Sequence, residues 1–302
     1  MKAADWSAID DRLIPLAGRR DEVLELVGAL RTRQSRLITG SPGMGKTRLL
    51  AEAACECGAP YLLRLAQYGD SFCDKSAPLP RADVGRPILA AAAFLGGSGR
   101  LKAGCGQNCP PHKGQVACHC IMRAPIVIRG PRVLHDLLTQ LAGILACGVT
   151  GATTMSLKPA VLESLKREPR AILLEDMEDA DPRMYRFLQA IYHSKGNSLI
   201  VTARSRESLG YVRRLLWDPR EEIRLQPLKR ADAAGLFEAA VAAYKLDSLD
   251  LDGFRSQVLR SARGNPGQIV AMCRLAARPE YRLGRRVKFL PLRMDALPAF
   301  IG

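Results

Sequence analysis

Apolar residues along this chain recur in two patterns, one with helical spacing and one of short unbroken runs. The helical spacing predicts helices over about 21–32, from about 48 to 54, over 134–145 and around 161–165. The unbroken runs predict strands at 36–39, 61–65, 171–174 and 198–202. Runs of this kind are typical of strands that are buried on both faces of a parallel sheet. The alternation of strands and helices therefore predicts an α/β fold, a parallel sheet flanked by helices.

Two long parts of the chain depart from this alternation. Residues 69–125 are rich in Pro, Gly and Cys, and we interpret them as an insertion. Beyond Pro227 the chain is rich in Ala and Leu at helical spacing and shows no clear strand, which predicts a small helical domain to about Ala277. The expected organisation is an N-terminal segment (1–36), a core (37–226) that contains the insertion, and a helical lid with a basic tail (227–302).

A glycine-rich turn joins the first predicted strand to the helix that follows it. The turn contains Gly40, Ser41, Pro42, Gly43, Met44, Gly45, Lys46 and Thr47, which is the spacing of a phosphate-binding loop. Glycines let backbone amides face phosphate oxygens, and the start of the helix adds its positive end. The pattern assigns Lys46 to the β- and γ-phosphates and Thr47 to Mg²⁺, and we count Arg48 among the nucleotide-binding residues. An ordinary glycine turn would not need this strand and helix on either side.

Two acidic residues end the strand predicted at 171–174. A phosphate-binding loop needs a second acidic site, at the end of a buried strand, that manages magnesium and water. Glu175 and Asp176 supply it. By position we expect Glu175 to bind Mg²⁺ with Thr47, and Asp176 to orient or deprotonate the attacking water, although the order is the reverse of the commoner Asp-Glu pair. The other interpretation is that these acids only cap a strand end.

Four motifs in this order resemble those of P-loop ATPases of the signal-transduction group (STAND) and of the related origin-recognition branch of AAA+ ATPases. Residues 16–22 (Leu-Ala-Gly-Arg-Arg-Asp-Glu) are similar to the Gly-Arg box that precedes the phosphate loop in that group. Residues 175–181 resemble its acidic second motif, 201–204 its Thr-x-Arg strand end, and 264–266 its Gly-Asn-Pro turn. The resemblance covers most of the chain except the cysteine-rich insertion, and it implies a P-loop ATPase with a helical lid.

The resemblance also implies roles for four residues outside the loop. Gly18 and Arg19 would lie beside the adenine and ribose, and Pro266 would close over the base from the lid. Arg204 would sense the γ-phosphate or an adjacent subunit and so take part in catalysis; a solvated surface residue is the alternative. The winged helix and repeat arrays of the signal-transduction group do not follow the Gly-Asn-Pro turn, after which about thirty-five residues remain.

Four of the nine cysteines lie close together in the insertion. Cys105, Cys109, Cys118 and Cys120 could supply four thiolates to one structural Zn²⁺, with His112 or His119 as substitutes. A segment so poor in apolar residues gains stability from a bound metal. An iron–sulfur cluster and unligated cysteines are the alternatives.

The chain is strongly basic. Its 302 residues include 45 Lys+Arg and 30 Asp+Glu, which gives a formal net charge of +15. Seven cations fall between residues 274 and 293, namely Arg274, Arg278, Arg282, Arg285, Arg286, Lys288 and Arg293. We expect these residues and the insertion to contact DNA without sequence preference, with a solvated or protein-docking face as the alternative. The sequence shows neither a membrane span nor a signal segment, so we expect a cytoplasmic protein.

Taken together, these features predict an ATP-dependent molecular switch. Such a protein binds ATP and Mg²⁺, hydrolyses ATP slowly, assembles with copies of itself across the nucleotide, and acts on DNA as a transposition- or loader-type helper with a protein partner. The alternative is a regulatory or defence scaffold, in which the nucleotide gates a protein partner without DNA binding. A metabolic kinase is least favoured, because the Gly-Arg box, Arg204 and the Gly-Asn-Pro turn would have no role in it.

Overall fold

The computed structural model describes residues 14–57, 125–147 and 153–296. Between residues 20 and 224, helices alternate with short strands. In chain order these elements are α1 (Arg20–Thr32), β1 (Arg36–Thr39), α2 (Lys46–Glu56), β2 (Ile126–Arg129), α4 (Leu134–Ile144), α5 (Thr154–Arg167), β3 (Ala171–Glu175), α6 (Pro182–Tyr192), β4 (Ser198–Ala203), the 3₁₀ turns η3 (Glu207–Arg214) and η4 (Pro219–Glu221), and β5 (Glu222–Arg224).

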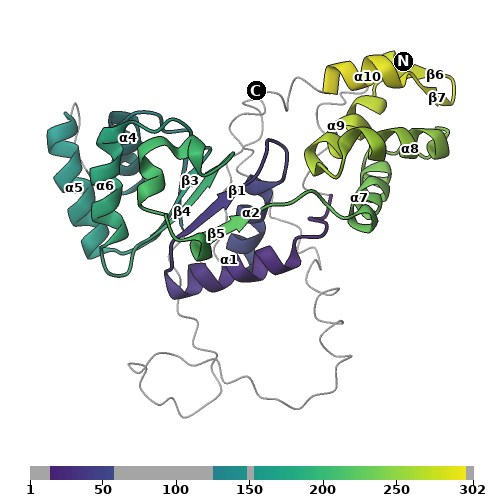
Figure 1. Cartoon of the computed structure of the whole chain (residues 1–302). Coiled ribbons are helices and arrows are strands. Elements are labelled where there is room, and N and C mark those ends of the chain that lie inside the picture. The colour runs from purple at the N-terminus through teal and green to yellow at the C-terminus, as the bar shows by residue number, and fades with distance from the viewer. Residues whose placement is uncertain (1–13, 58–124, 148–152, 297–302) are drawn as a thin grey trace, which may run out of the picture. The chain divides into compact units, whose positions relative to one another are not determined.

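Five strands form one parallel sheet in the order β2-β3-β4-β1-β5. Figure 1 shows β1 between β4 and the edge strand β5. The pairing places Thr39, at the end of β1, opposite Ala203 of β4, and it places Arg129 of β2 opposite Glu175 of β3. Since all strands run in the same direction, the loops that follow them meet at one edge of the sheet, which is where ligands bind in such sheets.

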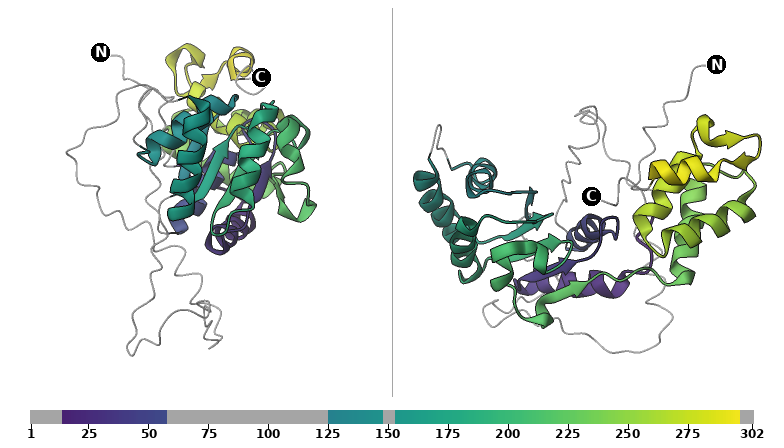
Figure 2. Two further views of the ribbon diagram at one scale, coloured as in Figure 1. Left: turned by 90° about the vertical axis from the view of Figure 1, so that its left-hand side faces the viewer. Right: turned by 45° about the horizontal axis from the view of Figure 1, so that its top comes forward.

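Successive residues of each strand point to opposite faces of the sheet, and each face has its own helices. Leu37 packs with residues of α4, α5, α6 and η3, whereas Ile38 packs with residues of α1 and α2. On β4, Val201 belongs to the first of these clusters and Ile200 to the second. Helices lie on both sides of the strands in the views of Figure 1 and Figure 2. The resulting three-layer core is that of a P-loop NTPase, which confirms the predicted fold class.

Helices make up most of the chain after β5, and we call residues 227–296 the C-terminal helical segment. Its elements are α7 (Arg230–Ala243), α8 (Leu251–Ala262), α9 (Pro266–Ala276), η5 (Pro279–Tyr281), an antiparallel hairpin of β6 (Arg282–Leu283) and β7 (Arg286–Val287), and α10 (Phe289–Ala296). The helices share an apolar core that includes Phe237, Tyr244, Phe254 and Leu292, all at most 3% exposed. Within the described ranges, no helix is long and apolar enough to cross a membrane.

The structure differs from the sequence analysis in three places. The apolar pattern does not predict β2, directly after the insertion, or β5, before the helical segment. The basic tail, for which the pattern predicts no element, folds over residues 279–296 as η5, a hairpin and α10. Tyr281 and Leu292 are buried in the helical core, and the Lys288 amide donates to the Tyr281 carbonyl oxygen at 2.8 Å, so apolar residues between the cations hold this segment in place. The strand predicted at 61–65 lies outside the described residues, as does the insertion apart from its last residue.

Candidate functional site

The glycine-rich loop 40–45 connects β1 to α2 at the edge where the strands end. The Gly40 amide donates a hydrogen bond to the Arg204 carbonyl oxygen at 3.2 Å, so the loop starts against the residue that follows β4. Gly45 has a φ of +89°, a conformation that residues with a side chain rarely adopt. It turns the chain directly into α2, which begins at Lys46. The strand, turn and helix that a phosphate-binding loop requires are therefore all present.

Lys46 is held at the base of this loop. It is 8% exposed, and its Nζ donates a hydrogen bond to the Gly40 carbonyl oxygen at 2.8 Å. Burial lowers the pKa of Lys46, while the charges of Asp176 and Glu178 raise it and that of Arg204 lowers it. The site therefore combines two cations and two anions that act on one another. An anion bound beside Lys46 would offset the cost of burying the ammonium group.

Asp176 is the exposed member of the acidic pair. Its φ is +50°, and its amide donates to the hydroxyl oxygen of Thr202 on β4 at 2.9 Å. The amide of the next residue, Met177, donates to the Thr202 carbonyl oxygen at 2.9 Å. Thr202 thus fixes the backbone that carries the Asp176 carboxylate. An exposed carboxylate at this position can accept a hydrogen bond from a water molecule and so orient it.

Glu175 is buried and paired with Arg129. It is 2% exposed, and its Oε2 lies 2.9 Å from Arg129 Nε. Its Oε1 is also buried and has no hydrogen-bond partner in the described parts of the chain. Burial raises the pKa of Glu175, Arg129 opposes this shift, and Asp176 adds to it. Glu175 therefore has one buried carboxylate oxygen without a partner in the described parts of the chain, while Arg129 balances part of its charge.

Arg204 is paired with Glu178, the second residue after Asp176. Arg204 Nε lies 2.8 Å from Glu178 Oε1, and the two side chains are 47% and 29% exposed. The structure thus places Arg204 at the rim of the loop, where the sequence motif puts it. Its role as a sensor stays a prediction.

The Gly-Arg box lies against the start of the helical segment. A Cβ at Gly18 would come within 2.7 Å of the Asp232 side chain on α7, so this approach requires glycine. Arg19 is 4% exposed, and its guanidinium donates to Glu22 Oε1 at 3.0 Å and to the carbonyl oxygen of Gln226. Arg19 therefore bonds the Gly-Arg box to Gln226, the residue that links the sheet to the helical segment.

The residues before the box connect α2 with the helical segment. Arg48, in the first turn of α2, donates from Nη2 to the Ile14 carbonyl oxygen at 3.2 Å. The Ile14 side chain is buried in the core of the helical segment. The N-terminal segment thus joins the helix that follows the loop to the C-terminal helices.

The turn before α9 is hydrogen-bonded directly to the glycine-rich loop. Asn265 Nδ2 donates to the Pro42 carbonyl oxygen at 2.9 Å, and the Gly267 amide donates to the Gly43 carbonyl oxygen at 2.9 Å. Pro266 lies between these two donors, at the first position of α9. The residue predicted to close over the base is therefore next to the loop, although 223 positions separate Pro42 from Asn265 in sequence.

Residues of a type that suits Mg²⁺ are present at the start of α2 and at the end of β3. The ion prefers oxygen ligands, and the hydroxyl of Thr47, the carboxylate of Asp176 and the unpartnered Oε1 of Glu175 are of this kind. Among the residues that the structure describes, no group of three or more His, Cys, Asp or Glu side chains is arranged to hold a metal. The zinc ligands predicted in the insertion lie outside those residues, namely Cys105, Cys109, Cys118 and Cys120.

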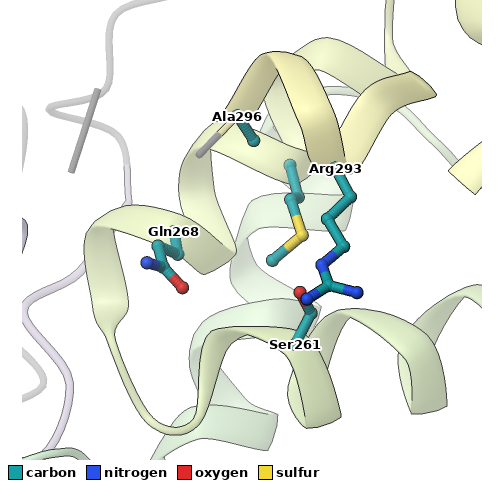
Figure 3. A pocket seen from close by; sticks show the side chains of 5 residues that line it. Ser261, Gln268, Arg293 and Ala296 are labelled. Carbon is teal, nitrogen blue, oxygen red and sulfur yellow. The ribbon is translucent and has the colours of Figure 1, made fainter. Parts of the chain in front are cut away.

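A small depression lies within the helical segment. Its lining residues, from α8, α9 and α10, are Ser261, Gln268, Met272, Arg293 and Ala296 (Figure 3). The space between these side chains does not admit even a water-sized group, whereas small-molecule sites typically have roughly 300–1,000 Å³. The depression is therefore too small to hold a nucleotide.

Three arginines of the basic segment make no side-chain hydrogen bond or ion pair among the described residues, namely Arg285, Arg286 and Arg293. Arg285 and Arg286 are exposed in the β6–β7 hairpin. The Asp250 amide donates to the Arg285 carbonyl oxygen at 2.7 Å and so fixes the turn of the hairpin. Arg282, in contrast, is engaged, because its Nε donates to the Ala276 carbonyl oxygen at 2.9 Å. Of the three arginines of the hairpin, Arg285 and Arg286 are the ones with guanidinium groups available to an outside anion.

Four residues of the site make contacts that the sequence analysis does not assign. They are Arg129, Glu178, Thr202 and Asn265. The last three lie inside the recognised motifs, so the motifs locate them without indicating their partners. Arg129 has no such signal, because its contact with Glu175 arises only when β2 pairs with β3.

Comparison with solved structures finds the same fold in origin-recognition proteins. The Aeropyrum pernix Orc1 protein in complex with DNA matches with a TM-score of 0.52 at 16% identity, over 96% of this chain and 68% of that one. Cdc6p from Pyrobaculum aerophilum matches with a TM-score of 0.55 at 14% identity, over 90% of this chain and 65% of that one. Drosophila ORC bound to DNA matches with a TM-score of 0.51 at 13% identity, over 97% and 64%.

These comparisons confirm, at the level of the fold, the resemblance to P-loop ATPases of the origin-recognition type. The chain spans about two thirds of the length of the matched proteins. No protein-family model matches the chain, and a search of curated protein sequences finds no match.

Proposed function

We propose that this protein is a nucleotide-driven molecular switch that binds and slowly hydrolyses ATP at the glycine-rich loop 40–45. The observation that carries the proposal is the buried Lys46 directly after that loop, with Asp176, Glu178 and Arg204 acting on it. This arrangement suits a ligand that ends in a phosphate chain. The turn before α9 contacts the same loop, so a bound nucleotide would also bear on the helical segment.

In the proposed reaction, water cleaves the terminal phosphate of ATP. Asp176 orients the water and takes its proton while the water oxygen bonds to the terminal phosphorus and the bond to the ADP oxygen breaks. Lys46 and Arg204 stabilise the charge on the transferred phosphate. Thr47 and Glu175 would hold Mg²⁺, which neutralises phosphate charge when bound. The remaining contacts, to the adenine, the ribose and the phosphates, are assigned to Gly18, Arg19, Pro266, Arg48 and the other residues of the loop.

Lys46→Ala tests this proposal. We expect the affinity for ATP to fall by at least about 100-fold, because the variant removes a buried cation that would bind phosphate. Lys195→Ala, which removes an exposed lysine after α6, is the control and should bind ATP normally. Calorimetric titration with ATP and Mg²⁺ measures both affinities. An unchanged affinity in folded Lys46→Ala would overturn the proposal.

DNA is the proposed macromolecular partner. Two of the proteins with this fold were solved bound to DNA. The net charge of +15 and the free guanidinium groups of Arg285 and Arg286 support contacts to the phosphate backbone without sequence preference. In this proposal the protein assembles with copies of itself and a protein partner, as a transposition- or loader-type helper.

The second candidate is a scaffold whose nucleotide gates a protein partner without DNA. It is favoured by three exposed apolar side chains of the helical segment, since such side chains suit protein contacts. They are Leu283, Leu290 and Met294, which are 68%, 69% and 62% exposed. A gel shift with and without ATP, at two salt concentrations, separates the candidates. ATP-dependent, salt-sensitive binding supports the DNA proposal, and no DNA binding in either condition supports the scaffold.

Structural Zn²⁺ in the insertion is a further part of the proposal. It rests on the clustering of Cys105, Cys109, Cys118 and Cys120. Elemental analysis of protein purified without chelator should find about one zinc per chain. A metal-free preparation would contradict it.

A further inference from the structure

One pair of opposite charges stands at the rim of the glycine-rich loop. The backbone holds one partner in place, because the Gly40 amide donates to the Arg204 carbonyl oxygen at 3.2 Å. The Arg204 side chain is held by Glu178, with Nε and Oε1 2.8 Å apart. It has no further side-chain partner among the described residues. A single carboxylate therefore positions this guanidinium group beside the loop.

A ligand in solution can reach this pair. Arg204 is 47% exposed and Glu178 is 29% exposed. Ion pairs with this degree of exposure change an equilibrium constant by a factor of only about 1.5–5. A phosphate group carries more charge than a carboxylate, and it can accept two parallel hydrogen bonds from one guanidinium group. A terminal phosphate at the loop is therefore the stronger partner for Arg204.

We propose that Glu178 sets how strongly the site prefers a nucleoside triphosphate over a diphosphate, by competing with the terminal phosphate for Arg204. With a diphosphate, Arg204 stays on Glu178. With a triphosphate, Arg204 leaves Glu178 and binds the terminal phosphate. The free energy needed to break the Glu178–Arg204 ion pair therefore weakens the binding of the triphosphate and leaves that of the diphosphate unchanged. The inference rests on the proposed ATP binding, and it adds a specificity-determining residue to that site.

The surroundings of Glu178 allow it to give up Arg204. Its charge also acts on Lys46, whose pKa it raises, so the released carboxylate keeps a neighbouring cation. Asp176 acts on Lys46 in the same direction. The exchange therefore leaves no carboxylate without a nearby positive charge.

Affinities for ADP and for a non-hydrolysable ATP analogue, each with Mg²⁺, test this inference by calorimetry. Glu178→Gln keeps the side-chain shape and removes the charge that holds Arg204. We expect it to raise the affinity for the analogue relative to ADP by about 2- to 5-fold. Arg204→Gln should lower that ratio. Once Arg204 is Gln, adding Glu178→Gln should raise the ratio much less, because no guanidinium group remains to compete for and only the effect of the Glu178 charge on Lys46 is lost.

Asp179→Asn is the matched control. It removes the carboxylate of the residue next to Glu178, between β3 and α6, and this exposed carboxylate has no ion pair with Arg204. The φ of Asp179, +49°, is one that Asn tolerates. The affinity of Asp179→Asn for the ATP analogue relative to ADP should equal that of the parent protein. The same rise in Asp179→Asn, or in Glu178→Gln with and without Arg204, would indicate a general charge effect and overturn the inference.

Two other outcomes are equally decisive. An unchanged ratio in a folded Glu178→Gln variant, checked by thermal unfolding, would overturn the inference. Arg204→Gln gives an independent measurement, and an unchanged ratio there would overturn it too. If the parent protein bound neither nucleotide, the proposed function itself would fail, whatever the variants did.

Discussion

Asn265 makes two hydrogen bonds with one side chain. Its Nδ2 donates to the Pro42 carbonyl oxygen at 2.9 Å, and its Oδ1 accepts from the Gln268 amide at 3.2 Å. The first bond reaches the glycine-rich loop, and the second caps the start of α9. Movement of α9 away from the loop would break the first bond and leave the second intact. The state of the loop and the position of α9 are therefore linked through this residue.

Asn265→Asp and Asn265→Ala should separate these two contacts. Asp keeps an oxygen that caps α9, but it lacks the donor to Pro42 and adds a negative charge beside the loop. We expect about tenfold weaker ATP binding with nearly unchanged stability. Ala loses both contacts, and the free energy of unfolding should also fall by about 1 kcal/mol. Calorimetry and urea unfolding measure the two effects. If Asp lowered stability as much as Ala, the capping role would be contradicted.

Arg129→Gln should destabilise the protein markedly. The variant leaves the buried Glu175 carboxylate without its counter-ion, which we expect to lower the free energy of unfolding by about 3 kcal/mol. Adding Glu175→Gln should recover part of this loss, because the unpaired charge is then gone. The control is Arg170→Gln, since the partner of Arg170, Glu168, is 40% exposed, and its cost should stay below about 1 kcal/mol. Equal losses in the two single variants, measured by urea unfolding, would contradict the prediction.

Asp176→Asn should separate binding from turnover. The amide cannot take a proton from water, so we expect normal ATP affinity and a turnover number lower by about 100-fold or more. Steady-state phosphate release and calorimetry provide the two measurements. If Glu175→Gln alone stopped hydrolysis and Asp176→Asn did not, the roles of the two acids would be the reverse of those proposed.

Tyr281 gives the stability of the helical segment a pH dependence. Its hydroxyl donates to Asp295 Oδ2 at 2.5 Å, and this bond, together with burial, raises the pKa of Tyr281 to about 12. An unfolded tyrosine titrates near 10, so the contribution is fully present below about pH 10 and is lost as the pH rises toward 12. Tyr281→Phe should lower the free energy of unfolding at pH 7 by about 1–2 kcal/mol.

The Tyr281→Phe variant should also lack the loss of stability between about pH 10 and 12, since it has no hydroxyl to ionise. Thermal unfolding of parent and variant, compared at each pH, isolates this contribution from that of other titrating groups. Asp295→Asn should move the midpoint of the difference back toward pH 10. Parallel profiles of parent and Tyr281→Phe would show that the hydroxyl does not contribute.

Arg285→Ala combined with Arg286→Ala should weaken DNA binding on all sequences alike. Two phosphate contacts fewer should reduce the slope of log affinity against log salt by about 2. The structure leaves Arg282 out of this test, because Arg282 is bonded to the Ala276 carbonyl oxygen. A second double variant, with Lys166 and Arg167 of α5 changed to Ala, removes two other exposed charges and should keep the parent slope. Equal slopes in all three proteins would mean that the hairpin is not the contact.

The parts of the fold that could be predicted from sequence are those coded by contiguous residues. The apolar runs of β1, β3 and β4 and the loop 40–45 carry their own pattern, and the structure has these elements at the predicted places. The edge strand β5 could not be predicted, because it has a single buried residue, Ile223, between Glu222 and Arg224, and one apolar residue does not form a recognisable strand pattern. The site shows the same limit. Motifs indicate which residues gather at the loop, but the pairs Arg129–Glu175 and Asn265–Pro42 depend on parallel strand pairing and on the docking of α9.

The contacts of the N-terminal segment have a consequence for shortening the chain. Ile14 is buried among the C-terminal helices, and Arg19 is bonded to the Gln226 carbonyl oxygen. A chain truncated to begin at Arg20 would keep every helix and strand described above, yet it would lose both of these contacts. The helical segment would then be joined to the sheet by the linker at Gln226 and by the turn at Asn265. The start of α1, an obvious boundary for a recombinant fragment, would thus yield two folded parts with a looser connection between them.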